Sequence, residues 1–380
     1  MLRRTLLSAL LAGVLLSTQF LAVTLQLNPH VSPWDGWRAL LLSLWVPWVA
    51  LGWAALALLA AALSGLRFWP EGLKRPVRAL PWFTSLVLAA LLAATAVAGF
   101  NLWNARYAVP VTAIQGLATL TAGLALGALA LLFVCLDALL FPYRSRRVSA
   151  ALVKLVYGLL LILPLALRPA PPPTPARVRL AMEPVASTRR LVLLAVDGLG
   201  PAELQASAAS GSAPALAQLL RRGAFGPLAT LRPTEGPAVW ASIFTGRYPR
   251  DHGIKSFSAY ALPGSAQRFD LLPKATLVPW LERGGFVERV PLSADARRGP
   301  ALWNALNALG LHAGVVRFWG TYPPERVKGF MLSHVFHQLL RDQPGRAGTA
   351  LYPPDLADQV QARAVDPRRD QAAVLEACVD

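Results

Sequence analysis

Charged residues are scarce in this chain of 380 residues. They make up 15% of it, and hydrophobic residues make up 55%. An ordinary globular domain carries about 25% charged residues. The shortage excludes a chain that is soluble throughout and predicts a membrane part, and the length leaves room for a second domain.

Cysteine and acidic residues are also few. The two cysteines, Cys135 and Cys378, exclude a disulfide framework and a cysteine-based metal site. Acidic residues number 20 against 37 Lys and Arg, for a net charge of +17. Residues 1–176 hold 13 of the basic and 3 of the acidic residues, and the remainder hold 24 and 17. Because the second excess is mild and accompanies no binding motif, no nucleic-acid partner is expected.

Five apolar runs dominate the first half and predict five membrane-spanning helices, since a span needs about 20 apolar residues. They are Thr5–Leu25, Ala39–Leu63, Phe83–Leu102, Ala113–Phe141 and Ala150–Leu167. The first run follows two arginines and could be a signal peptide, but no convincing small-residue cleavage site precedes Gln26. We therefore expect residues 1–168 to form a five-helix region whose partner is the lipid bilayer.

The basic residues of this region lie in alternate loops: before the first run, between the second and third, and between the fourth and fifth. Such loops stay in the cytoplasm. The pattern predicts a multi-pass protein of the plasma (inner) membrane with a cytoplasmic N-terminus. After five crossings the C-terminal domain is extracytoplasmic, or periplasmic.

A proline-rich stretch, RPAPPPTPARVR at 168–179, separates the two halves. Its composition favours an extended, stiff spacer. We interpret residues 169–188 as a linker and residues 189–380 as a separate α/β domain.

This domain opens with an apolar run, Leu191–Val196, that ends in Asp197-Gly198. A continuous run of this length suits a strand buried on both faces of a parallel sheet. Ligands of open α/β sheets bind beyond the carboxyl ends of such strands. Asp197 is therefore a candidate ligand of a divalent cation, and the alternative is an ordinary turn aspartate.

Further elements follow along the domain. Gly236 and Pro237 suit the start of a helix, whose free N–H groups would face an anion. The patterns predict helices at Ala213–Arg222, Ala238–Phe244, Trp303–Leu309 and Leu351–Val365, and strands at Phe225–Leu231 and His312–Phe318.

An ordered set of motifs resembles the alkaline phosphatase superfamily, and within it the type I phosphodiesterase/nucleotide pyrophosphatase branch. The motifs are Asp197-Gly198, Pro233-Thr234, Trp240, Thr245-Gly246 and Pro249-x-x-His252-Gly253-Ile254. The resemblance covers 189–258 and, more loosely, 321–333. It implies a mixed, mostly parallel sheet sandwiched by helices. It also implies hydrolysis or transfer of phosphate esters with two divalent metals, usually Zn²⁺, and a Thr or Ser nucleophile.

The chain departs from the family at that nucleophile. Counted back from Thr245-Gly246, the position falls on Gly236, which has no hydroxyl. Thr234 is a weak substitute, Ser242 a weaker one, and a metal-activated water is a third route. His252 occupies a structural position of the family and is not counted as a metal ligand.

The family's later metal ligands are missing as well. Beyond His252 the only histidines are His312, His334 and His337, and none lies in the family's Asp-x-x-x-His or Asp-His-Gly context. We interpret His334 and His337 as solvent-exposed. The domain is also shorter than the family's usual one, so we expect its sheet to be incomplete at the C-terminal end, with an open edge.

Three functions follow from the resemblance. The first is a membrane-anchored, metal-dependent phosphodiesterase or phosphatase-like hydrolase, impaired at Gly236, that acts on an unknown phosphate ester. The second is a phosphoethanolamine- or phosphoglycerol-type transferase of the envelope, although Val196-Asp197-Gly198 differs from the motif of those enzymes. The third is a non-catalytic binding protein on a degenerate phosphatase fold.

Overall fold

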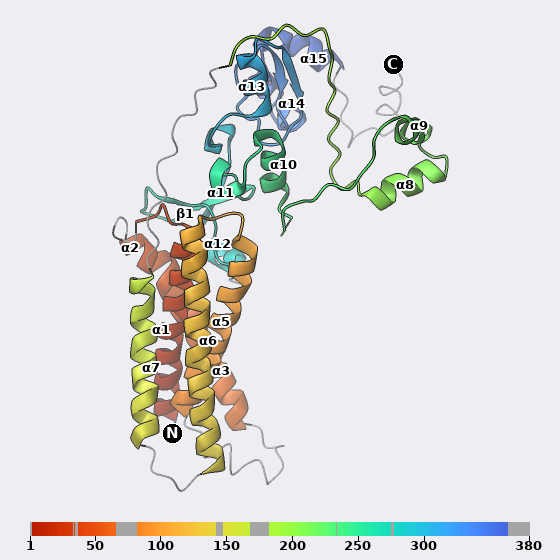
Figure 1. Ribbon diagram of the computed structural model, residues 1–380. Coiled ribbons are helices and arrows are strands. Elements are labelled where there is room, and N and C mark those ends of the chain that lie inside the picture. Colours follow the sequence, from red (N-terminus) through yellow and green to blue (C-terminus); the bar gives the residue numbers. More distant parts are fainter. Residues whose placement is uncertain are drawn as a thin grey trace.

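The computed structural model describes residues 2–32, 34, 37–65, 82–141, 147–167, 182–232, 234–274 and 277–363. Its N-terminal part is a bundle of long helices (Figure 1). They are α1 (Leu2–Leu27), α2 (Trp37–Leu40), α3 (Val46–Gly65), α5 (Trp82–Ala105), α6 (Val111–Leu140) and α7 (Arg147–Ala166). A π-helical turn, Leu41–Trp45, joins α2 to α3. Pro47 follows this turn and cannot donate a backbone hydrogen bond, which accounts for the local change of pitch.

Four of these helical segments are long and apolar enough to cross a membrane: Arg4–Leu27, Trp37–Ala62, Phe83–Ala105 and Val111–Leu140. The first four predicted spans therefore have their counterparts. The apolar part of α7, Val148–Pro164, is shorter. Length and composition thus support four candidate spans and do not establish the fifth.

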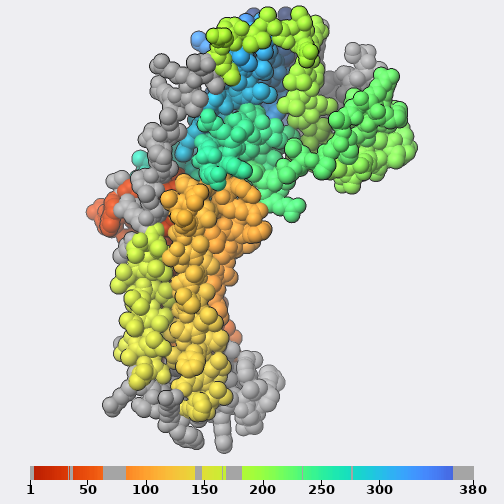
Figure 2. Space-filling view, in the orientation of Figure 1, coloured from red at the N-terminus to blue at the C-terminus, as the bar shows by residue number. Residues whose placement is uncertain are grey.

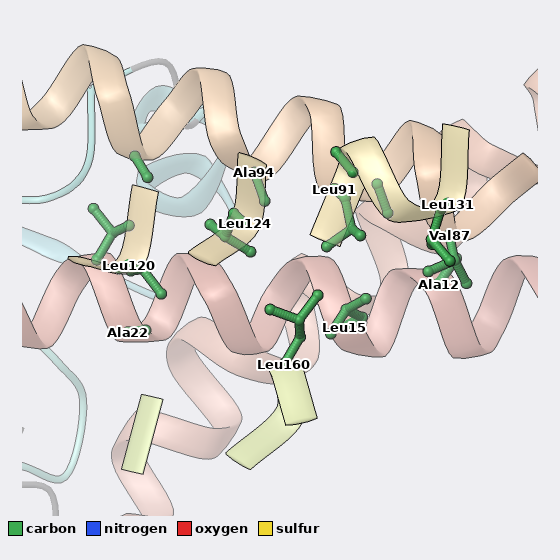
Figure 3. Close-up of a cluster of buried hydrophobic side chains, with 14 of the residues drawn as sticks. Ala12, Leu15, Ala22, Val87, Leu91, Ala94, Leu120, Leu124, Leu131 and Leu160 are labelled. Carbon is green, nitrogen blue, oxygen red and sulfur yellow. The ribbon is translucent and has the colours of Figure 1, made fainter. Parts of the chain in front are cut away.

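Leucine and alanine side chains from α1, α5, α6 and α7 fill the core of the bundle (Figure 3). Between α1 and α3, small residues allow the two helix backbones to approach closely, as in many membrane bundles. A Cβ atom on Gly13 of α1 would lie 3.0 Å from the backbone nitrogen of Trp53 in α3. Polar side chains add contacts between helices: the Gln19 side-chain amide donates to the Leu160 carbonyl at 2.7 Å.

The C-terminal part is a mixed α/β region. Its helices are α8 (Pro201–Ala209), α9 (Pro214–Arg222), α10 (Gly236–Thr245), α11 (Pro249–His252), α12 (Val278–Arg283), α13 (Leu302–Ala308), α14 (Phe336–Asp342) and α15 (Ala357–Arg363). Its strands are β1 (Ser258–Ala261), β2 (Arg268–Phe269), β3 (Glu288–Pro291), β4 (Ala313–Val316), β5 (Gly329–Leu332) and β6 (Leu351–Tyr352). Short 3₁₀ turns lie at Ala294–Ala296, Pro344–Ala350 and Pro354–Leu356.

The strands form two small sheets, where the resemblance implied one mostly parallel sheet. The first has the order β2-β1-β3 and is antiparallel throughout. The second has the order β4-β5-β6. In it β4 pairs with β5 in parallel, with Ala313 opposite Gly329, and β6 pairs with β5 antiparallel. The main core of the domain lies between this second sheet, α10 and α13, and contains Phe244, Trp303 and Met331.

Several predicted elements are confirmed, namely the helices now labelled α9, α10 and α13 and the strand β4. The helix predicted at Leu351–Val365 is wrong in its first half. There β6 and a 3₁₀ turn precede α15, because Pro353 and Pro354 cannot donate the hydrogen bonds of a continuous helix. The proline-rich stretch at 168–179 lies outside the described residues.

The strands predicted at Leu191–Val196 and Phe225–Leu231 are also wrong. Both segments are extended, but neither pairs with a neighbour. A strand exists only through its hydrogen-bonded partners. Leu191 and Leu228 are 89% and 88% exposed, so neither run is buried against a core. The sheet β4-β5-β6 accordingly ends at β4 among the described residues.

The domain rests on one end of the bundle. Figure 2 shows the surface around α10 and α11 in contact with the ends of α5 and α6. An apolar cluster spans the junction, with Leu40 and Trp48 from the bundle against Leu262 and Phe269 of the domain. The α10 helix is thereby held close to the ends of the membrane-length helices.

Candidate functional site

Helix α10 begins at Gly236, the residue that the sequence comparison predicts to stand at the family's nucleophile position. Glu235 precedes the helix in an extended conformation, and Pro237 occupies the first turn, where its missing N–H costs nothing. The helix ends at Gly246, whose φ of 66° is a left-handed conformation that favours glycine. The N–H groups of the first turn have no partner within the helix and can bind an anion.

Space is available at Gly236 for a side chain. A Cβ atom built there would have as its nearest neighbour a ring carbon of Phe257 at 3.9 Å, which is an ordinary contact. Gly236 also precedes Pro237, and a proline disfavours the helical conformation of any larger residue before it. The glycine suits this local geometry, but the surrounding packing does not require it.

The two hydroxyls near Gly236 are directed elsewhere. Thr234 is exposed, and its hydroxyl donates to the Leu231 carbonyl at 3.1 Å. Ser242 lies nearly two turns into α10, where its hydroxyl donates to the Ala238 carbonyl at 2.8 Å. Neither side chain occupies the first helical position.

His252 is completely buried beneath α10. Its Nδ1 accepts a hydrogen bond from the Ile254 N–H at 3.1 Å, so the proton of a neutral ring lies on Nε2. Nε2 then donates to the Ser242 hydroxyl at 3.0 Å. Burial, together with a smaller effect of the nearby positive charge of Arg297, lowers the pKa of His252 to about 4. The ring therefore joins α10 to α11 as a neutral structural group.

Asp197 lies on an exposed turn just after the unpaired segment Leu191–Val196. Among the described residues, no three His, Cys, Asp or Glu side chains come together in a way that could hold a metal ion. One exposed carboxylate is too few ligands for a zinc ion, so the described residues supply at most one ligand of the metal site that the resemblance implies. The role of Asp197 as a metal ligand stays a prediction.

The interpretation of His334 and His337 as solvent-exposed is wrong. Both are half-buried. The His334 ring packs 6.0 Å from the ring of Trp319, and burial lowers its pKa. The His337 ring lies edge-on to Phe336, 5.5 Å away. Both histidines pack against aromatic side chains.

A cavity of about 270 Å³ lies beside the start of α10, and its walls come from both halves of the chain. Its lining includes Glu235 just before α10, Ala238 of α10, Lys255 and Lys274 from the rest of the domain, and Asn101 from the end of α5. Lys274 forms an ion pair with Glu235.

A second ion pair, 2.7 Å long, joins the largely buried Lys255 to Asp270. Burial by itself raises the pKa of Asp270, but the charges of Lys255 and His30 outweigh it and hold that pKa below its ordinary value.

Polar residues at the ends of the helices fasten the domain to the bundle. Asn28, just after α1, donates to the Leu271 carbonyl at 2.6 Å and accepts from its N–H at 3.1 Å. Asn101 of α5 accepts from the Lys274 N–H at 2.8 Å. The carbonyl of Tyr107 accepts from the Arg250 N–H at 3.0 Å.

These contacts were not predicted from the sequence. The available signal was an asparagine near the end of each of two otherwise apolar runs.

Comparison with known proteins identifies the domain. Residues 191–376 match the family model described as "Type I phosphodiesterase / nucleotide pyrophosphatase". No curated protein and no solved structure shows significant similarity to the chain. The matched range begins at Leu191 and includes Asp197, Thr234 and Gly236. Beyond its four membrane-length apolar helices, this chain thus carries a type I phosphodiesterase/nucleotide pyrophosphatase domain.

Proposed function

We propose that the chain is a membrane-anchored, metal-dependent phosphate-ester hydrolase whose turnover is limited by the glycine at position 236. The family match supports the reaction class. The observation that carries the limitation is Gly236, which starts an anion-binding helix with open space where a hydroxyl would stand. Thr234 remains a weaker candidate for the nucleophile, because its hydroxyl donates to the Leu231 carbonyl.

Asp197 is the proposed metal ligand. Its support is the family match, which begins at Leu191 and includes Asp197-Gly198. The carboxylate is exposed on a turn, where a cation can reach it from solvent.

Helix α7 is the proposed fifth crossing. It packs along α1, with the Tyr157 hydroxyl donating to the Leu11 carbonyl at 3.0 Å and the Gln26 side chain donating to the Leu167 carbonyl. It therefore covers most of the length of a helix that can itself span a membrane. The helix termini that adjoin the basic segments lie at the end of the bundle that faces away from the domain (Figure 1). This supports a cytoplasmic N-terminus and an extracytoplasmic domain in the plasma (inner) membrane.

The test is hydrolysis of bis(p-nitrophenyl) phosphate by the full-length chain in detergent with Zn²⁺. We expect slow turnover that a chelator abolishes and that Asp197→Asn reduces at least tenfold, since this removes a charged metal ligand. Asp355→Asn, which changes an exposed carboxylate of the same domain, is the matched control. Turnover that survives both the chelator and Asp197→Asn would contradict the proposal.

A further inference from the structure

The cavity beside α10 is built jointly by the bundle and the domain. Its lining includes Leu27, Asn101, Asn104, Tyr107 and Ala108 from the bundle and Glu235, Lys255, Ser256, Tyr260 and Lys274 from the domain. We infer that this cavity binds the phosphate headgroup of a membrane phospholipid. The inference rests on the proposed function and deepens it by naming the substrate class.

The depth of the cavity matches the headgroup layer. Trp34, Trp37 and Trp103 lie at the same ends of the helices, and their side chains are 69%, 52% and 60% exposed. Exposed tryptophans concentrate at the boundary between hydrocarbon and water. Trp103 shares its helical turn with Asn101 and Asn104, which line the cavity. A lipid can therefore reach this level by lateral diffusion, without leaving the bilayer.

Lys274 is the cation of the cavity that a phosphate can reach, because its side chain is 41% exposed. Lys255 also lines the cavity, but its side chain is 6% exposed and is paired with Asp270 at 2.7 Å. Ala238, in the first turn of α10, adds a backbone N–H. Glu235 lines the same cavity and is paired with Lys274. A phosphate that enters the cavity competes with the Glu235 carboxylate for Lys274, so Glu235 weakens phosphate binding.

The size of the cavity restricts what part of a ligand it holds. Pockets for drug-sized ligands have volumes of about 300–1,000 Å³. At about 270 Å³ this cavity holds a headgroup and no more. The acyl chains of the same lipid would stay in the bilayer, beside the apolar wall that Leu27 and Ala108 provide.

Native mass spectrometry of the full-length chain in detergent tests the inference, with dioleoylphosphatidylglycerol as the probe. Dioleoylglycerol, which lacks the phosphate, and inorganic phosphate, which lacks the chains, distinguish the source of the recognition. We expect the phospholipid to bind at least tenfold more tightly than either. Equal binding of dioleoylglycerol, or inorganic phosphate binding as tightly as the lipid, would overturn the assignment.

Two substitutions with opposite expected effects separate binding from a structural role. Lys274→Ala removes a charged hydrogen-bond donor and should weaken phospholipid binding about tenfold. Glu235→Gln removes the rival carboxylate and should strengthen it. Lys328→Ala, at an exposed lysine outside the cavity, is the matched control and should change nothing. If both cavity variants weakened binding alike, or if Lys274→Ala had no effect, the inference would fail.

Binding is measured here without turnover, so the two proposals fail separately. Phospholipid binding without hydrolysis of any phosphodiester leaves the headgroup site standing and counts against the hydrolase. Hydrolysis of bis(p-nitrophenyl) phosphate by a chain that does not bind the phospholipid counts against the headgroup site alone.

Discussion

His252 owes its chemistry to its surroundings. The residue is fully buried, and both ring nitrogens have partners, the Ile254 N–H and the Ser242 hydroxyl. The motif Pro249-x-x-His252-Gly253-Ile254 indicated a structural position through its resemblance to the family. In the structure Gly253 adopts a left-handed φ of 82°, which few other residues tolerate. The hydrogen bond to Ser242 could not be predicted, since it depends on how α10 packs against α11.

Burial of His252 predicts a pH dependence of stability. Its pKa is about 4 in the folded chain against 6.5 when unfolded, so only the unfolded chain takes up a proton between these values. The stability that the neutral ring contributes is complete above about pH 6.5 and is lost as the pH falls towards 4. The loss is about 3 kcal/mol.

Denaturant unfolding of the wild type and His252→Asn between pH 7 and 4 measures this loss. The decrease in the free energy of unfolding from pH 7 to pH 4 should be smaller in His252→Asn than in the wild type. It should stay the same in His312→Asn, which changes an exposed histidine. If the free energy of unfolding of His252→Asn depended on pH as strongly as that of the wild type, the buried ring would not be the source of the pH dependence.

At the scale of elements, the sequence predicted the helices that local interactions determine. Helices α9, α10 and α13 follow from the spacing of their apolar residues and from the proline and glycine residues at their ends. The strand predicted at Leu191–Val196 depends on a partner distant in sequence, and the structure leaves it unpaired and exposed.

At the scale of the whole molecule, composition alone separated the membrane-length helices from the α/β domain. What it could not predict is that the domain packs on the ends of α1 and α5 through residues such as Asn28 and Asn101. Those contacts join positions more than a hundred residues apart, and no local pattern encodes them.

The proposed orientation predicts which parts of the intact cell surface can be labelled. A cysteine at Ser212, exposed in the domain, should react with a membrane-impermeant maleimide applied outside the plasma (inner) membrane. A cysteine at Ser145, in the basic segment between α6 and α7, should react only after the membrane is opened. The reverse pattern would place the domain in the cytoplasm.

Restoring the missing hydroxyl tests the central claim most directly. Steady-state hydrolysis of bis(p-nitrophenyl) phosphate with Zn²⁺ is compared among the wild type, Gly236→Thr and Gly236→Ala. A Cβ atom at Gly236, which both variants share, has no neighbour closer than 3.9 Å. A nucleophile at the start of α10 should raise kcat at least tenfold in Gly236→Thr, a fall of about 1.4 kcal/mol in the barrier, and leave Gly236→Ala at the wild-type rate. An unchanged kcat in Gly236→Thr, or an equal rise in Gly236→Ala, would contradict the account.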